Sequence, residues 1–381
     1  MRILTAGESH GKALVAILEG FPKGVKIDID FINEELRRRQ AGFGRGKRMQ
    51  IEKDRVEIVS GVRNKITIGS PVSVLIKNRD QKIFPEKKDD LASLYIPRPG
   101  HADLAGLLKY GEKDIHNILE RASARETAAR VCIGSICKLF LKEFNIKIAS
   151  FTVSIGGITS FKKPKNVEEI IKKTRNSLLN CIDKDKERLM IKEIEKVKKE
   201  KDTVGGVVEI WADNVPAGLG SFMHFDKRLD AKIAYYLMSI PAIKGVEIGL
   251  GFRCAEKRGS QVHDAIFYSE NKGLYRKTNN CGGIEAGVSC GMPIIVRIAM
   301  KPISTLMNSL DSVNLLTKKK QKAPLVRSDI CAVASCGVVA ESMLAITLVE
   351  SFLEKFGCDS LKEIKRNYRE YLKLISKISQ K

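Results

Sequence analysis

The sequence is poor in aromatic residues, which bears on whether the protein binds nucleic acid. Phe, Trp and Tyr together make up 6% of the 381 residues, and Trp211 is the single tryptophan. Nucleic-acid-binding proteins usually offer aromatic stacking platforms or a recognisable module, and the sequence contains no such module. A nucleic-acid-binding protein is therefore the weaker interpretation.

The sequence also lacks cysteines at the spacing of metal or redox sites. Its nine cysteines are an odd number, and none forms a Cys-x-x-Cys pair. They are Cys132, Cys137, Cys181, Cys254, Cys281, Cys290, Cys331, Cys336 and Cys358. This pattern favours scattered thiols in a reducing compartment over a disulfide or zinc framework. We therefore expect a cytoplasmic protein without a metal centre.

No segment has the pattern of a signal peptide, and one apolar stretch must be weighed as a membrane span. The first ten residues contain neither a long apolar run nor a small-residue cleavage site. Residues 330–349 are mostly apolar, but Glu341 lies in their middle and would be costly in lipid. A buried helix is expected there, and no membrane partner.

Acidic residues are outnumbered by basic ones. Lys and Arg total 67 against 45 Asp and Glu, so the formal net charge is +22 and the pI is about 9.6. The electrostatic field of such a protein attracts nucleic acid, acidic membranes or small phosphorylated and carboxylated molecules. Net charge alone does not indicate which of these the protein binds. The hydrophobic fraction of 43% and charged fraction of 29% exclude a mainly disordered, collagen-like or coiled-coil chain.

Two stretches of the chain repeat the same signals in the same order. In each, a glycine is followed eleven residues later by Pro-x-Gly, then by a helix signal, Val-Glu-Ile, a Gly-x-Pro strand entry and an arginine before a long helix. The paired positions are Gly11 and Gly205, Pro22 and Pro216, Val56 and Val246, Pro71 and Pro293, and Arg98 and Arg327. Because a duplicated unit keeps its order while its loops vary, these matches indicate an internal repeat.

The repeat predicts the fold class. We expect an α+β fold, with long central helices packed on antiparallel sheets and related halves at about 1–150 and 203–356. Residues 162–202 are rich in Lys and Glu at helical apolar spacing, which predicts a solvated helical insertion. A second insertion, 253–285, contains Asn279-Asn280-Cys281-Gly282-Gly283, and long segments of this kind often carry function.

The first candidate site is Gly7-Glu8-Ser9-His10-Gly11. Its glycines imply a tight turn that holds His10 at a strand end, where a ligand can approach the backbone. Histidine titrates near neutrality and can donate or accept a proton. Ser9 could instead be a nucleophile activated by His10, although adjacent residues in a turn rarely point at one another. A purely structural turn is an equal alternative.

The second candidate is a basic cluster, Arg37-Arg38-Arg39, followed by the glycine-rich run 42–48. Guanidinium groups suit phosphate and carboxylate recognition, and glycines let the backbone contribute. The run is not a dinucleotide fingerprint, because a strand-like stretch follows where a helix should begin, and no Walker sequence occurs. A solvated basic face is the alternative.

The third and fourth candidates are both short motifs that begin with an arginine. Arg98-Pro99-Gly100-His101-Ala102-Asp103 predicts a turn that puts a histidine beside an arginine. Arg327-Ser328-Asp329 opens a helix in the second half, and Asp329 could accept a proton in a cationic pocket. In both motifs a helix cap is the alternative. The remaining histidines, His116, His224 and His263, lack such neighbours.

The fifth candidate is the segment 120–127. Ser123 and Glu126 fit a capping box, which predicts a helix from here through Leu141. A helix N-terminus offers free N–H groups and a positive dipole end, and Arg121 and Arg125 lie beside it. We therefore favour an anion site over simple capping.

Taken together, these motifs resemble the chorismate synthase family. The similarity runs from Met1 to about Phe356 in the order of the family. The segments that carry it are Gly7-Glu8-Ser9-His10-Gly11, Arg39-Gln40 with Gly44-Arg45-Gly46, Arg98-Pro99-Gly100-His101-Ala102-Asp103, Ser123-Ala124-Arg125-Glu126-Thr127, Lys244-Gly245-Val246-Glu247, Gly282-Gly283-Ile284 and Arg327-Ser328-Asp329.

The resemblance implies a single-domain β-α-β sandwich spanning 1–381, usually assembled as a homotetramer. It implies a carbon–oxygen lyase that converts 5-enolpyruvylshikimate 3-phosphate to chorismate and phosphate, the last shared step toward the aromatic amino acids. This anti-1,4-elimination has no net redox change yet requires reduced FMN. The sequence leaves open whether the protein reduces its own flavin. An external flavin reductase, with NADPH as indirect reductant, is the interpretation that we keep.

The resemblance also implies residue roles. His10 would protonate or hydrogen-bond the reduced flavin, and His101 would act as general acid toward the departing phosphate. Asp329, near flavin N5, would take part in proton removal with Ser9 in the relay. The positions that match flavin contacts are Arg121, Ala122, Ser123, Pro241, Ala242, Ala286, Lys301, Pro302, Ile303, Ser304, Thr305 and Arg327. The positions expected to bind substrate or NADP are Arg39, Arg45, Arg48 and Arg125.

Four positions depart from the family pattern. Pro241 stands where Asn is common, Ala286 replaces a glycine, Ala122 replaces Ser and Ile330 replaces Pro. These departures bear on binding details rather than on the reaction. Two functions of other classes stay open: a basic nucleic-acid-binding protein and an NADPH-consuming flavin reductase.

Overall fold

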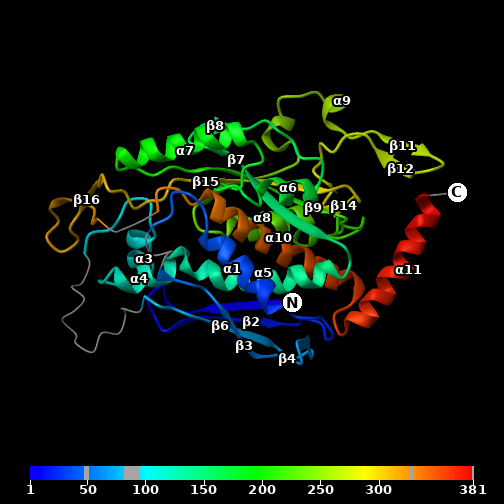
Figure 1. Cartoon of the computed structure of the whole chain (residues 1–381), viewed down its shortest axis with the longest axis horizontal. Coiled ribbons are helices and arrows are strands. Elements are labelled where there is room, and N and C mark those ends of the chain that lie inside the picture. The colour runs from blue at the N-terminus through cyan, green and yellow to red at the C-terminus, as the bar shows by residue number, and fades with distance from the viewer. Residues whose placement is uncertain (47–50, 81–94, 326–328, 380–381) are drawn as a thin grey trace.

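The computed structural model describes residues 1–46, 51–80, 95–325 and 329–379. Two antiparallel sheets enclose a layer of helices (Figure 1). The first sheet has the order β1 (Arg2–Ala6), β2 (Ala13–Glu19), β6 (Val72–Lys77), β3 (Val56–Ser60). The second has the order β10 (Ile243–Ile248), β15 (Ile294–Met300), β9 (Gly206–Asp213), β7 (Lys147–Ile155), β8 (Ile158–Thr159).

The central helices separate the two sheets, as Figure 1 shows. They are α5 (Thr127–Lys142) and α10 (Val333–Phe356), with α1 (Ile29–Gln40) and α8 (Leu229–Met238) beside them. Nearly every residue of α5 and α10 is buried, as expected for helices that are apolar on all sides. They pack closely, since a Cβ on Gly134 would lie 2.3 Å from the Cβ of Ser342. The predicted α+β class, with helices between antiparallel sheets, is confirmed.

The strands follow the two-residue period of half-buried sheets. In β2, Leu14, Ala16 and Leu18 face the helices, and the residues between them are more exposed. In the first sheet β6 lies between β2 and β3, and in the second β15 lies between β9 and β10. This shared order is what a duplicated unit would produce. The division into halves at about 1–150 and 203–356 stays a prediction.

Glu341 makes the apolar helix α10 part of a buried charge cluster. The helix is long and apolar enough to cross a membrane, but 94% of its most apolar window is buried within the protein. Arg38 donates to both Glu341 oxygens at 2.9 and 3.0 Å, and Lys138 donates at 2.5 Å. Burial alone would raise the pKa of Glu341, but these two cations outweigh it and hold the pKa well below its usual value. The expected buried helix is confirmed.

The segment 162–202 contains α6 (Val167–Thr174) and α7 (Lys184–Lys199), so its predicted helical character is confirmed. The second insertion contains short elements: η4 (Gly251–Cys254), α9 (Gly259–Val262), the hairpin β11 (Ile266–Ser269) with β12 (Gly273–Arg276), and β13 (Ile284–Glu285), which pairs with β14 (Val288–Ser289) beyond it. The other elements among the described residues are β4 (Val62–Arg63), β5 (Ile66–Thr67), α3 (Asp103–Tyr110), α4 (His116–Ala122), η2 (Ala124–Glu126), η3 (Phe225–Lys227), β16 (Asp311–Val313), β17 (Lys320–Lys322) and α11 (Leu361–Ser379).

The capping box predicted at Ser123 is wrong. A short 3-10 turn, η2, separates α4 from α5, and the Ser123 hydroxyl accepts from the backbone N–H of Arg125 rather than of Glu126. The Glu126 carboxylate pairs with Arg130 at 2.7 Å. Because Glu126 points along α5, it cannot return to Ser123. The helix that the motif predicted therefore begins at Thr127.

Candidate active site

The turn between β1 and β2 holds His10 against a carboxylate from α4. Glu120 Oε2 accepts from the backbone N–H of His10 at 2.8 Å, and Glu120 Oε1 lies 2.7 Å from His10 Nδ1. Asp80 Oδ2 lies 4.0 Å from the other ring nitrogen, Nε2. Because a carboxylate can only accept, we assign the Nδ1 proton to the bond with Glu120. The ring is thereby oriented, and Nε2 is the nitrogen available for proton transfer.

Ser9 is turned away from His10. It is buried, and its hydroxyl donates to the Ser123 hydroxyl at 3.0 Å. Its backbone N–H donates to the Glu120 carbonyl at 2.9 Å. A Ser–His nucleophilic pair therefore has no support in this geometry. Gly7, with φ of 107°, makes the turn feasible, because a Cβ there would lie 2.3 Å from the Ala13 carbonyl oxygen.

Arg121 lies beside this turn and is bound only to neutral oxygens among the described residues. Its guanidinium donates to the carbonyls of Gly7 at 3.2 Å and Thr5 at 2.9 Å, and to the Thr5 hydroxyl at 2.8 Å. These bonds fix the side chain without balancing its charge. Arg121 can therefore attract a phosphate or carboxylate group of a ligand.

Arg39 and Arg125 form a buried ion cluster under the turn. Asp54 binds both of them, at 3.4 Å from Arg39 NH1 and 2.6 Å from Arg125 NH1. Glu52 lies 3.6 Å from Arg125 NH2. Burial lowers the pKa of Arg39 to about 10, and Asp54 partly offsets that effect. Asn78 links the cluster to the His10 turn, since it accepts from Arg125 and donates to the carbonyl of Gly11.

These bonds show what Arg39 and Arg125 do within the protein. Two buried carboxylates balance their charge, and these ion pairs connect α1 and η2 to the segment 52–54. Their expected contacts with substrate or NADP stay predictions. Arg48, from the same set, lies outside the described residues.

The glycine run 42–46 meets Asp329 from the second half. The backbone N–H of Gly46 donates to Asp329 Oδ1 at 2.5 Å, and Arg45 NH1 lies 3.2 Å from Oδ2. The Ile330 N–H also donates to the Gly44 carbonyl at 2.8 Å. Arg45 is near enough to Arg39 to help lower its pKa, so Asp329 adjoins the buried cluster. Arg327, from the same motif, lies outside the described residues.

His101 belongs to a hydrogen-bonded triad at the start of α3. Arg98 donates to both oxygens of Asp103, at 2.8 Å from Nε and 2.9 Å from NH2. His101 Nδ1 lies 2.5 Å from Asp103 Oδ1. Burial would raise the pKa of Asp103, but the hydrogen bonds from His101 and Arg98 outweigh it and hold the pKa well below its usual value. Asp103 therefore stays ionised and orients the imidazole.

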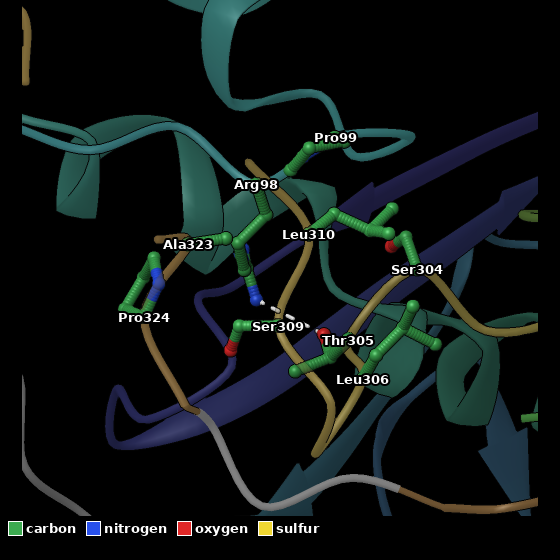
Figure 2. A pocket seen from close by; sticks show the side chains of 9 residues that line it. All are labelled: Arg98, Pro99, Ser304, Thr305, Leu306, Ser309, Leu310, Ala323 and Pro324. Carbon is green, nitrogen blue, oxygen red and sulfur yellow. Dashed lines mark hydrogen bonds between the residues drawn. The ribbon is translucent and has the colours of Figure 1, made fainter. Parts of the chain in front are cut away.

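The segment 301–305 lies against this triad. Lys301 donates to the Gly100 carbonyl, a neutral partner, and Arg98 NH1 lies 3.5 Å from the Thr305 hydroxyl. Figure 2 shows Arg98 reaching toward Thr305 within a hollow that Ser304 also lines. The hollow has a volume of about 10 Å³, which is room for roughly one water molecule and not for a ligand.

The segment 203–205, just before β9, joins the Asp329 and His101 neighbourhoods. The Val204 N–H donates to the Ile330 carbonyl at 2.9 Å, and the Thr203 hydroxyl donates to the Ile303 carbonyl at 2.6 Å. Gly205 packs so closely that a Cβ would lie 2.3 Å from the Met300 oxygen. His10, the buried ion cluster, Asp329 and His101 thus form a series of neighbouring groups, linked stepwise by ion pairs, hydrogen bonds and short backbone segments from both ends of the chain.

The other expected flavin positions divide into two groups. Ala242 joins the series, because its carbonyl accepts from the Lys301 N–H at 2.9 Å, and Pro241 precedes it. Ala122 ends α4 beside Arg121. Ala286 lies at the turn between β13 and β14, and no hydrogen bond between described residues joins it to the series. Ala242 and Ala286 both have positive φ, 71° and 48°, where a glycine would be less strained.

Glu120 and Asp103 are the functional partners that the sequence alone did not assign. Each lies inside a motif singled out above, but Glu120 is 110 residues from His10 in the chain. No spacing rule links residues that far apart. For Asp103, a signal was present: an acid two residues after His101 within a Pro-Gly turn.

The fold and site together define a strongly basic α+β sandwich protein whose site includes two histidines, His10 and His101, each bound to a carboxylate. A family model described as chorismate synthase matches residues 1–353. The chorismate synthase of Alkaliphilus metalliredigens is 52% identical over 377 residues, covering 97% of this chain and 99% of the relative. That of Aquifex aeolicus is 50% identical over 387 residues, covering 98% and 97%. The chain belongs to the chorismate synthase family.

Solved structures agree with this assignment. A structure described as "Crystal Structure of Chorismate Synthase" superposes with a TM-score of 0.81 at 44% sequence identity, and 98% of each chain is covered. The predicted family is therefore confirmed, and so is the expected sandwich of helices between sheets.

Proposed function

We propose that the protein converts 5-enolpyruvylshikimate 3-phosphate to chorismate and inorganic phosphate by anti-1,4-elimination, with reduced FMN as cofactor. Family membership supports the reaction. The observation that carries the proposal is the series of contacts that links His10, Asp329 and His101, with the cations Arg121 and Lys301 at its ends. An elimination of phosphate from a carboxylated ring needs an acid, a base and cationic anchors, and the series contains all three.

The residues present fit an anionic cofactor and an anionic substrate. Arg121 and Lys301 bind only neutral oxygens among the described residues, so each retains an unbalanced positive charge. The buried arginines Arg39 and Arg125 are balanced already, so they would reinforce the site rather than supply its main anion contacts. When bound, reduced FMN supplies electron density to the allylic system of the substrate as phosphate leaves.

His101 is suited to the role of general acid. Asp103 fixes the ring through Nδ1 and stays ionised, which stabilises the protonated imidazole electrostatically. Lys301, beside Gly100, would hold the departing phosphate near the ring. His101 would then deliver a proton to the leaving oxygen.

His10 and Asp329 would carry out the remaining proton transfers. Glu120 orients His10 through Nδ1, so Nε2 would be the nitrogen that exchanges a proton with the cofactor. Gly46 and Arg45 hold the Asp329 side chain in place, and Asp329 would accept a proton during loss of the ring hydrogen. The Ser9–Ser123 hydroxyl pair, at the His10 turn, would form part of the relay.

The proposal also covers the location of the protein, its assembly and the source of reduced flavin. The protein would work in the cytoplasm as a homotetramer, and an external flavin reductase would supply reduced FMN at the expense of NADPH. Native mass spectrometry tests the assembly. A predominantly monomeric or dimeric protein at working concentration would contradict the tetramer.

The deciding assay is anaerobic. Dithionite-reduced FMN and the substrate are added to the full-length protein, and chorismate and phosphate are measured. Equal amounts of both products, with no consumption of reduced flavin, are expected. Absence of chorismate under these conditions would refute the proposal, and stoichiometric NADPH oxidation during turnover would favour a flavin reductase.

A further inference from the structure

Two cysteines that the proposed reaction does not use lie together in the second insertion. Cys281 and Cys290 lie on either side of the hairpin formed by β13 and β14, and their sulfur atoms are 4.0 Å apart. Glu285, on β13, completes a group whose three potential ligand atoms all lie within 4.8 Å of one another. Both cysteines are half-buried free thiols.

The loop that carries Cys281 is held by buried polar contacts. Asp264 accepts from the backbone N–H of Asn280 and of Cys281, each at 2.9 Å. Asn279 accepts from the Gly283 N–H at 2.8 Å. The Cys290 N–H donates to the Gly283 carbonyl at 3.0 Å, so both thiols are anchored to the same short backbone segment. This anchoring fixes the separation of the sulfurs before any ligand binds.

The sulfur separation is compatible with a shared metal ion. With Zn–S bonds of about 2.3 Å at tetrahedral angles, two thiolates lie roughly 3.8 Å apart. The 4.0 Å between the unbonded sulfurs of Cys281 and Cys290 is close to that edge of a zinc tetrahedron.

The charge and the outer contacts of the group also suit a divalent cation. Arg276 binds the Glu285 carboxylate at 2.7 and 3.1 Å, as an outer partner that orients a metal-binding carboxylate. Two thiolates and one carboxylate carry three negative charges, and Arg276 offsets one of them. The remaining two match a divalent ion. Thiolate ligands select soft ions such as Zn²⁺ over Mg²⁺ or Ca²⁺.

We propose that Cys281, Cys290 and Glu285 bind one soft divalent cation, for which Zn²⁺ is the expected ion, with a fourth position left to water. The ion cross-links the two ends of the β13–β14 hairpin and so fixes the turn that presents Ala286. The proposal would replace the scattered-thiol interpretation for this pair, because Cys-x-x-Cys spacing is not the only way to bring two sulfurs together. The proposal does not depend on the reaction proposed above.

The test uses untagged full-length protein, reduced with a phosphine and titrated anaerobically with Co²⁺ as the probe. We expect binding of about one ion per chain, with thiolate-to-cobalt charge-transfer absorption, and displacement by Zn²⁺. Cys281→Ser and Cys290→Ser should each abolish the absorption, whereas Cys254→Ser, which alters another half-buried thiol, should retain it. Arg276→Gln should weaken binding by about 10- to 100-fold.

A second measurement on the wild-type protein avoids variants that fail to fold. Zn²⁺ should protect Cys281 and Cys290 from alkylation, read by peptide mass spectrometry, while Cys254 and Cys358 stay reactive. Failure of the wild-type protein to bind Co²⁺ would overturn the proposal, and so would Co²⁺ absorption that persists in the Cys281→Ser/Cys290→Ser double variant. Equal alkylation of Cys281 and Cys290 with and without Zn²⁺, or a disulfide between them as the only product under mild oxidation in the presence of Zn²⁺, would also overturn it.

Discussion

His10 and His101 are each bound by a carboxylate, Glu120 and Asp103 respectively, but their surroundings differ. His101 shares the ionised Asp103 with the buried guanidinium of Arg98. His10 is bound by Glu120 and also lies near a second carboxylate, Asp80, with 26% of its side chain exposed. The first site thus contains two basic groups around one acid, and the second contains one basic group between two acids.

This difference predicts different structural roles for the two acids. Asp103 balances the buried charge of Arg98 as well as orienting His101. Glu120 orients a histidine that is partly exposed. Replacing the acid at each site should therefore have unequal consequences.

Removal of Asp103 should destabilise the fold most. Asp103→Ala leaves the guanidinium of Arg98 buried without its charged partner, which typically costs about 3–5 kcal/mol. The matched change Glu120→Ala should cost only about 1 kcal/mol, since it removes hydrogen bonds from a partly exposed histidine. Urea unfolding of both variants measures the difference. Equal losses of unfolding free energy in the two variants would contradict the expected difference between the sites.

Removal of the proton-transfer groups should lower turnover strongly without a comparable loss of stability. His101→Ala and Asp329→Ala should each reduce the rate of chorismate formation by roughly a hundredfold or more, as is typical for a positioned acid or base. His224→Ala is the control, because His224 forms an exposed pair with Asp226 that resembles the other histidine sites only locally. If either variant keeps the wild-type rate, the replaced residue does not have the role proposed for it.

The sequence predicted the order of elements well, because a repeat and period-two apolar patterns are local signals. The helix signal between Pro22 and Val56 corresponds to α1, and the strand entry at Pro71 leads directly into β6. The predicted start of α5 was wrong. Ser123 accepts from the Arg125 N–H and Glu126 pairs with Arg130, and three-dimensional packing decides these partners.

The site could be predicted only in part, since residue types do not reveal which charges balance. The arginine cluster suggested ligand contacts for Arg39, but Asp54 lies fifteen residues on and is drawn beneath it by folding. The pairing of His10 with Glu120 brings the β1–β2 turn against α4 across 110 residues of sequence. Long-range meetings of this kind follow from the tertiary fold rather than from motif spacing.

Glu120→Gln should lower the reaction rate moderately. The variant separates the effect of Glu120 on the orientation of His10 from the effect of its negative charge. The amide oxygen can still accept from His10, but the negative charge is lost. We expect a rate reduction of about tenfold, with little change in the KM for the substrate, since Glu120 acts through His10 rather than on the substrate. Steady-state kinetics with saturating reduced FMN checks this. A large rise in KM with an unchanged kcat would instead place Glu120 among the substrate contacts.

The smallest expected effect is a change in how the free energy of unfolding depends on pH in acid, when Asp103 at the His101 site is replaced. The hydrogen bonds from His101 and Arg98 hold the pKa of Asp103 below its ordinary value of 3.8, so its contribution to stability is present above that value and is lost as pH falls below it. In Asp103→Asn that titration is absent, and the free energy of unfolding should fall less steeply than in the wild-type protein between about pH 4 and pH 2. Urea titrations across this range, with the exposed Asp226→Asn as a control for general loss of charge, compare the slopes. Identical slopes in the wild-type protein and Asp103→Asn would show that Asp103 is not the ionised anchor of the His101 site.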